Sequence, residues 1–289
     1  MLPFIACAII VCTAAWLVPP ERAEPRAGEV EARLAAELDS RIGLLTAWQR
    51  DRRSSLEAIA DAEELRTRVR QANDRAEIAR HLARVCLGFE GCAVHASGGR
   101  LIADFQNRES PEELVLRAGT GRTSQGGVVS TDPVGRPVAQ ARSEWPRERW
   151  SIHFATPIFD GGRVAAVLVG RARADRQLDP LLCRRRPGRT GETYLVAPTG
   201  YMVTPSRFPV RQRAASGPAR VLQHPAMAML DHSDELERTV RDGALHRRGI
   251  DVNGYPDYRG VRVVGAWQWL DDLGASVITE MDAAEVFLR

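Results

Sequence analysis

The same order of elements, strand, tight turn and strand, opens and closes two successive stretches of this chain. The first stretch begins with a hairpin pattern at 92–105 and ends with a longer one at 150–173. The second begins at 191–208 and ends at 258–287. Alternating apolar residues on both sides of Gly- and Asp-rich turns are typical of antiparallel hairpins. We therefore expect two α/β modules of related architecture, each framed by two hairpins, with helical stretches at 174–182 and 221–241.

A helical segment at about 24–85 precedes the two units. In its first half apolar residues recur every three or four positions, which is one face of an amphipathic helix. These residues are Val30, Leu34, Leu38, Ile42, Leu45 and Trp48. The pattern weakens over 50–55, resumes at Leu56, and Asp74 offers an N-cap for a further helix. Such a stripe suits a stalk, a dimer seam or the spine of a folded domain, and its period does not distinguish them.

Residues 1–18 form an almost unbroken apolar run that ends at Pro19-Pro20. A helix of this length reaches about 27 Å, close to the thickness of a bilayer core. We expect an uncleaved anchor, with a signal peptide cut near 13–15 or a buried N-terminal helix as the alternatives. Anchor and signal peptide both leave the rest of the chain outside the cytoplasm. The expected location is the inner (cytoplasmic) membrane, crossed once, with the bulk of the chain in the periplasm.

Cysteine usage fits an extracytoplasmic chain. Cys7 and Cys12 lie in the apolar run, where they behave as small hydrophobic residues. Cys86 and Cys92 stand close in sequence, and an oxidising compartment favours a disulfide between them, with two buried thiols as the alternative. Cys183 is then left over and is either free or links two chains.

Composition excludes several kinds of protein. All 40 basic side chains are arginine, so sites built on a P-loop lysine, a Schiff-base lysine or a Ser-x-x-Lys pair are ruled out. A net charge of only +3 argues against a nucleic-acid partner. The six histidines have neither HExxH nor zinc-finger spacing, and no Gly-x-Ser-x-Gly elbow occurs. We predict a protein without catalytic residues, metal or cofactor, and therefore not an enzyme.

Two groups of residues in the second unit carry a family resemblance. The first group is Thr190-Gly191-Glu192-Thr193-Tyr194-Leu195-Val196, Gly200, Thr204 and Ser206-Arg207-Phe208. The second is Asp257-Tyr258-Arg259-Gly260-Val261, Val263, Trp267, Trp269-Leu270 and Glu280-Met281-Asp282-Ala283-Ala284-Glu285. They resemble the first and last strands of the proximal module in the double Cache sensor domain, the extracytoplasmic ligand-binding region of bacterial chemoreceptors, sensor kinases and cyclases. In the first unit 155–158 and 167–170 fit more loosely.

The resemblance covers about residues 25–289 and implies an α+β fold. In that fold a long N-terminal helix supports two PAS-like (Cache) modules with antiparallel sheets. The expected boundaries are an anchor or signal segment at 1–20, a helical spine at 24–85, a membrane-distal module at 86–182 and a proximal module at 188–289. The family binds small ligands, usually in the distal module, and carries out no catalysis.

This sequence departs from the family pattern in two ways. Amino-acid-binding members have an Arg-x-Trp-aromatic run before the distal strands and an acidic residue at the end of the last strand. Here the run reads Arg147-Glu148-Arg149-Trp150-Ser151, and Arg171 stands where a carboxylate would bind an amine, so an amino-acid ligand is unsupported. Signalling members continue into a second span and an output domain, whereas this sequence stops at Arg289, so we expect a separate signalling partner or a missing output domain.

The candidate ligand-binding residues are aromatic, histidine and arginine side chains near the hairpins. They are Arg147, Arg149, Trp150, His153, Arg171, Tyr194 and Tyr258. A guanidinium matches a carboxylate with its planar fork of donors, and Trp supplies an apolar wall, so the arginines predict a small anionic ligand. The alternatives are a solvated basic loop for the arginines and core packing for the aromatic residues.

Together these features predict a membrane-anchored sensor that binds a small molecule outside the cytoplasm. Ligand would shift the population of positions of the long helix, which would relay occupancy to a partner or through a homodimer formed along the Val30–Trp48 stripe. A ligand-free scaffold assembled through the same helix is the alternative. A secreted enzyme is a further alternative that no catalytic constellation supports.

Overall fold

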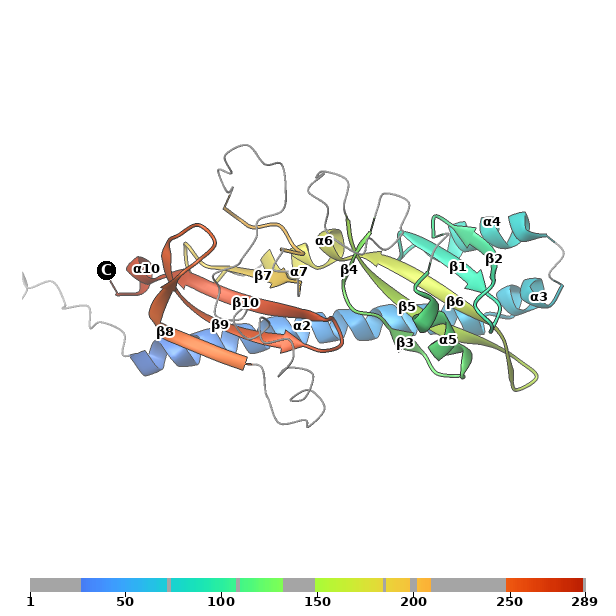
Figure 1. The fold of residues 1–289 in the computed structure, drawn as a ribbon, viewed down its shortest axis with the longest axis horizontal. Coiled ribbons are helices and arrows are strands. Elements are labelled where there is room, and N and C mark those ends of the chain that lie inside the picture. The colour runs from blue at the N-terminus through green and yellow to red at the C-terminus, as the bar shows by residue number, and fades with distance from the viewer. Residues whose placement is uncertain are drawn as a thin grey trace, which may run out of the picture.

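The computed structural model describes residues 27–71, 74–107, 110–131, 149–183, 186–197, 202–208 and 248–287. One long helix runs beside two antiparallel sheets in an elongated molecule (Figure 1). The helices are α2 (Ala27–Asp61), α3 (Glu63–Gln71), α4 (Arg75–Val85), α5 (Glu112–Gly119), α6 (Ala174–Gln177), α7 (Asp179–Cys183) and α10 (Ala283–Phe287). The strands are β1 (Gly91–His95), β2 (Leu101–Phe105), β3 (Ser124–Gln125), β4 (Val129–Thr131), β5 (Arg149–Asp160), β6 (Arg163–Arg173), β7 (Glu192–Val196), β8 (Arg248–Pro256), β9 (Arg262–Leu270) and β10 (Ala275–Asp282).

Some sequence predictions fall outside the described residues. Among them are the apolar run at 1–18, the helix at 221–241 and the candidate site residue Arg147. No helix within the described ranges has the length and the apolar content that crossing a membrane requires.

The first sheet, sheet A, has the strand order β2-β1-β6-β5-β3, with β4 also paired to β5. Both predicted hairpins of the first unit are confirmed: β1 pairs with β2, and β5 pairs with β6 over almost their whole length. The long hairpin turns at Gly161 and Gly162, which both have positive φ, a conformation that glycine adopts without steric cost.

The second sheet, sheet B, has the order β7-β10-β9-β8. The closing hairpin is confirmed as β9–β10, but the opening one is wrong in its second strand, which the structure reduces to a single bridge between Val196 and Met202. Strand β8 was not predicted, because its Asp-Val-Asn-Gly sequence indicates a turn. The turn is a bulge inside the strand, where Asp251 Oδ1 accepts hydrogen bonds from the backbone N–H groups of Asn253 and Gly254 at 2.7 and 3.0 Å.

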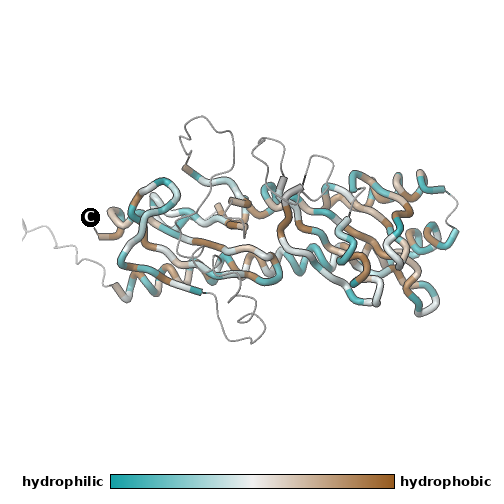
Figure 2. The backbone as a smooth tube through the Cα atoms, in the orientation of Figure 1, coloured by the Kyte–Doolittle hydropathy of each residue, from teal (hydrophilic) through white to brown (hydrophobic). Residues whose placement is uncertain are grey.

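Helix α2 is 35 residues long, about 52 Å at 1.5 Å per residue, and contacts both sheets. Its apolar stripe faces them: Val30, Leu34, Leu38, Leu45, Leu56 and Ala60 are at most 4% exposed. Hydrophobic residues also gather along the strands of both sheets (Figure 2). The stripe is therefore the spine of the fold, and the dimer seam predicted along it is not available.

The predicted weakening of α2 over 50–55 is wrong, since the helix is continuous there. Arg52 lies in this stretch and donates a hydrogen bond to the backbone carbonyl of Gly88 at 2.8 Å. The charged side chain of Arg52 thus makes a tertiary contact at a position where the local sequence pattern indicates an interruption of the helix.

Cys86 and Cys92 form a disulfide with their Cα atoms 6.4 Å apart, which closes the loop between α4 and β1. The carbonyl of Gly88 in this disulfide loop (86–92) accepts a second hydrogen bond, from Gln177 of α6 at 3.2 Å. Phe89 in the same loop lies edge-on to Phe154 of β5, with 6.1 Å between ring centroids. The disulfide loop thereby connects α2, sheet A and the segment that leads to sheet B.

The two sheets also meet directly. The backbone N–H of Val128 donates to the carbonyl of Leu273 at 2.6 Å, and Gln125 donates to the carbonyl of Asp272 at 2.8 Å. The N-terminal half of α2 lies along sheet B, and the C-terminal end of the described chain lies near its start (Figure 1). Sheet B and both ends of the described chain therefore occupy the same end of the molecule.

Candidate functional site

Each sheet turns one face to α2 and the other away from it. On β5, Ile152 and Phe154 belong to the core that includes α2, and Phe154 stacks edge-on against Trp48 at 5.8 Å. Ala155 instead packs with Val169 and with α5. Because successive side chains of a strand point to opposite faces, His153 lies on the face away from α2. We call this the distal face.

His153 and Arg171 are register partners on β5 and β6, so both lie on the distal face. Arg171 is 2% exposed and donates to the backbone carbonyl of Gln106 at 2.8 Å, and its guanidinium is 3.4 Å from Glu90. His153 is 1% exposed, and neither of its ring nitrogens has a hydrogen-bond partner among the residues the structure describes. Burial, reinforced by the charge of Arg171, lowers the pKa of His153 to about 3, so the ring is neutral at physiological pH.

Asn107 follows Gln106 and is completely buried. Its amide nitrogen is 3.4 Å from Ser110 Oγ, which also bonds to His95 Nε2 at 3.0 Å. Its side-chain carbonyl oxygen has no partner in the described part of the chain. Sequence patterns gave no signal for Asn107, because it stands in a polar loop like many others.

The other distal residues predicted from sequence are not brought together with His153. Trp150 is 5% exposed and lies in the core shared with α2, on the opposite face of β5. Arg149 begins β5, and the structure describes only its backbone. Arg147 falls outside the described residues.

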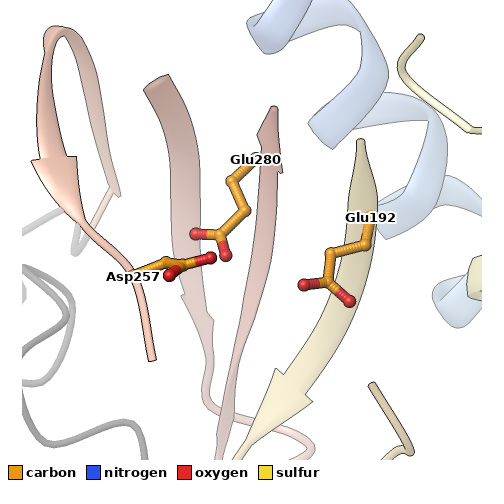
Figure 3. A group of neighbouring side chains, drawn as sticks. All are labelled: Glu192, Asp257 and Glu280. Carbon is orange, nitrogen blue, oxygen red and sulfur yellow. The ribbon is translucent and has the colours of Figure 1, made fainter. Parts of the chain in front are cut away.

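Sheet B carries a group of three buried carboxylates on its face away from α2. Glu192 comes from β7, Glu280 from β10 and Asp257 from the loop after β8, and the three side chains point toward one another (Figure 3). One oxygen of each lies within 4.8 Å of the others. The sequence signal that could have indicated this acidic cluster is Glu280, which follows Val277-Ile278-Thr279 and is the one glutamate of strand 275–282.

Three tyrosine hydroxyls donate hydrogen bonds to the two glutamates of the acidic cluster. Tyr194 and Tyr255 donate to Glu280 at 3.0 and 3.2 Å, and Tyr258 donates to Glu192 at 2.5 Å. The two tyrosines predicted from sequence, Tyr194 and Tyr258, thus meet, with ring centroids 5.8 Å apart. Burial raises the pKa values of all three hydroxyls, so they stay protonated donors.

Asp257 is paired with Arg259, which also reaches Asp282 at 2.8 Å. Carboxylate oxygens of this kind are the ligands that hard cations prefer. Each carboxylate here accepts hydrogen bonds or an ion pair from its own neighbours. We therefore interpret the acidic cluster as a polar core network of sheet B.

Glu192 gives the network a testable pH dependence. Burial raises its pKa above 4.5, and the nearby charge of Glu280 adds to the effect, against a lowering by the Tyr258 hydrogen bond. A carboxyl with a raised folded-state pKa stabilises the fold below its unfolded pKa, and this contribution is lost as pH rises through the folded pKa. We expect urea unfolding of Glu192→Gln to depend less on pH between 4 and 8 than that of the unsubstituted protein. The exposed Glu31→Gln is the control, and equal pH profiles for the Glu192 variant and the unsubstituted protein would contradict the expectation.

A pocket of about 230 Å³ opens between α7 and β7. It is lined by Asp179, Leu182, Cys183, Arg186, Gly191, Glu192, Thr193, Pro205, Ser206 and Arg207. Cys183 is the free cysteine of the described chain, and its thiol donates to Asp179 at 3.0 Å. Burial together with this acceptor raises the pKa of the thiol to about 12, so it is not a nucleophilic thiolate.

No protein-family model and no curated protein matches the sequence. The fold, however, matches solved sensor domains. The sensor domain of the V. cholerae histidine kinase DctB aligns with a TM-score of 0.55 and 10% identity, over 89% of this chain and 98% of that one. The ligand-binding domain of the Pseudomonas aeruginosa PAO1 amino acid chemoreceptor PctB, solved with L-Arg, aligns with a TM-score of 0.51 and 12% identity, over 91% and 99%. The expected α+β fold, a long N-terminal helix beside two modules with antiparallel sheets, is thereby confirmed.

Proposed function

We propose that this chain is the extracytoplasmic, small-ligand-binding module of a membrane-anchored sensor. The observation that carries the proposal is His153, a fully buried imidazole without a hydrogen-bond partner in the described chain, on the distal face of a sensor-type fold. Buried polar groups are almost always hydrogen-bonded, so an unpaired one marks a place where a ligand can supply the missing bonds. The Cys86–Cys92 disulfide supports an oxidising compartment.

The relay follows from the two faces of sheet A. Ligand on the distal face acts on β5 and β6, and the opposite face of the same strands packs against α2. A ligand that prefers one arrangement of these strands shifts the population of α2 positions toward that arrangement. Because α2 continues along sheet B to the end where the anchor is expected, its displacement is a signal that a partner or output domain can receive.

Thermal unfolding against a metabolite panel tests the proposal. The full chain in detergent, followed by its intrinsic tryptophan fluorescence, is expected to show a higher midpoint with at least one small molecule, because a ligand that binds only the native state stabilises it. A broad panel of organic acids, amides, amines, sugars and nucleosides without any stabilising member would refute the sensor function. It would favour a scaffold without a ligand, although one assembled through a surface other than the buried α2 stripe.

A further inference from the structure

Among the residues that the structure describes, the distal face holds hydrogen-bonding atoms without a partner, beside apolar side chains and paired charged ones. Ala155, Val167 and Val169 pack with α5 on this face, and His153 and Asn107 contribute the unpaired polar atoms. Arg171 connects the two, because it is the register partner of His153 and bonds to the carbonyl next to Asn107. A buried donor or acceptor without a partner loses its hydrogen bonds to water and gains none in return, so this face is suited to molecules that restore the bonds.

The charged side chains that the structure describes beside Arg171 on this face are paired with one another. Arg171 and Arg173 both lie 3.4 Å from Glu90, and Arg173 also bonds to Asp175 at 2.6 Å. His153 is neutral, as its low pKa requires. An anionic ligand would have to compete with Glu90 for Arg171. It would also place two negative charges in one buried site, which is unfavourable because a buried charge without its own counter-ion is poorly solvated.

The unpaired atoms of His153 and Asn107 determine which hydrogen-bond donors and acceptors a ligand must carry. A neutral imidazole presents one donor and one acceptor, and the side-chain oxygen of Asn107 presents an acceptor. The ligand must therefore supply at least one N–H or O–H donor and one acceptor oxygen or nitrogen. A primary amide or a lactam has both on one planar group, where the carbonyl oxygen and the N–H group are bonded to the same carbon, and it carries no charge.

We infer that the distal face binds an uncharged small molecule of the amide or lactam type, at His153 and Asn107, in place of the anionic ligand that the arginines suggest. The inference rests on the proposed function, because it names the class of ligand for the same sensor site. It also assigns His153 as a residue that determines ligand specificity.

Matched acid and amide pairs provide the test. The probes are acetate and acetamide, propionate and propionamide, succinate and succinamide, benzoate and benzamide, and nicotinate and nicotinamide, each measured by the thermal midpoint of the full chain and by calorimetric titration. We expect at least one amide to bind at least 10-fold more tightly than its acid. Binding by acids alone would overturn the inference and leave the sensor function intact. If neither set binds, the inference also fails, whereas the sensor function is decided by the wider metabolite panel.

The variant His153→Leu separates a ligand-binding role from a structural one. It removes a buried polar ring that lacks a partner, so the ligand-free protein is expected to unfold at an equal or higher temperature. The same variant is expected to weaken amide binding at least 10-fold. His81→Leu, which changes another buried histidine that lies on α4, is the control and should leave binding unchanged. Unaltered amide affinity in His153→Leu would overturn the assignment.

Discussion

Replacing Phe154 with alanine is expected to lower the free energy of unfolding by about 3–5 kcal/mol, the usual cost of removing a buried phenylalanine. Phe154 is completely buried where three parts of the fold meet. Its ring lies edge-on to Trp48 of α2 and to Phe89 of the disulfide loop, at 5.8 and 6.1 Å. Edge-to-face aromatic pairs add to the hydrophobic contribution, and the cavity left by alanine cannot be filled by a rigid helix and a closed loop.

Urea unfolding followed by tryptophan fluorescence measures the effect. Phe159→Ala is a matched control, because Phe159 lies at the end of the same strand and is 37% exposed. It should lose clearly less than Phe154→Ala, because a side chain that is 37% exposed has less buried area to lose and leaves no closed cavity. Equal losses for the two variants would mean that Phe154 does not hold α2 to sheet A.

Removal of the disulfide is expected to have the second largest effect. The double variant Cys86→Ala/Cys92→Ala should lose about 2 kcal/mol, the chain-entropy estimate for releasing a loop of this short length. The loss reaches further than the loop itself. Gly88 accepts hydrogen bonds from both Arg52 and Gln177, and Glu90 pairs with Arg171 and Arg173, so a released loop loosens α2, α6 and the distal face together.

Unfolding of the double variant and of Cys183→Ala in the same buffer gives the comparison. Cys183 is free among the described cysteines, so its substitution controls for the loss of a thiol. The unsubstituted protein treated with a reductant should behave like the double variant. An unfolding midpoint that reductant does not move would show that the closed loop contributes nothing to stability.

Much of the fold follows from local sequence patterns. The apolar period of 30–48 placed the buried stripe of α2 correctly, and the Gly-Gly turn at 161–162 placed the long hairpin. The second strand of the hairpin at 191–208 failed for a specific reason. There the hydroxyl oxygen of Thr204 accepts a hydrogen bond from the backbone N–H of Leu195 at 3.0 Å. This side-chain bond stands in place of the backbone hydrogen bond that a second strand would have formed with the N–H of Leu195.

The candidate sites were harder to predict, because their residues are assembled from distant segments. Tyr194 and Tyr258 were chosen from sequence, but the carboxylates they meet come from three separate elements. On the distal face, His153 and Arg171 were both candidates from the sequence and lie opposite each other on β5 and β6. Glu90 reaches Arg171 only because β1 pairs with β6, where the backbone N–H of Glu90 donates to the carbonyl of Arg171 at 2.8 Å. Because Glu90 is the counter-ion of Arg171, the ligand that we propose is a neutral molecule and not an anion. Neither a hydrophobic period nor a sequence motif predicts this ion pair.

The continuous helix that both sheets share also constrains the number of residues in α2 between its contacts with sheet B and its contacts with sheet A. Inserting one residue in α2 between Leu45 and Leu56 would turn the following residues by about 100° and move them by about 1.5 Å along the axis. Because Leu34 and Leu38 lie before that point and Leu56 and Ala60 after it, all in one buried row, the two halves could no longer face their sheets together. Surface loops of such a protein can change length with little effect on the fold. The segment of α2 between the two modules, in contrast, does not accept the insertion or deletion of a single residue.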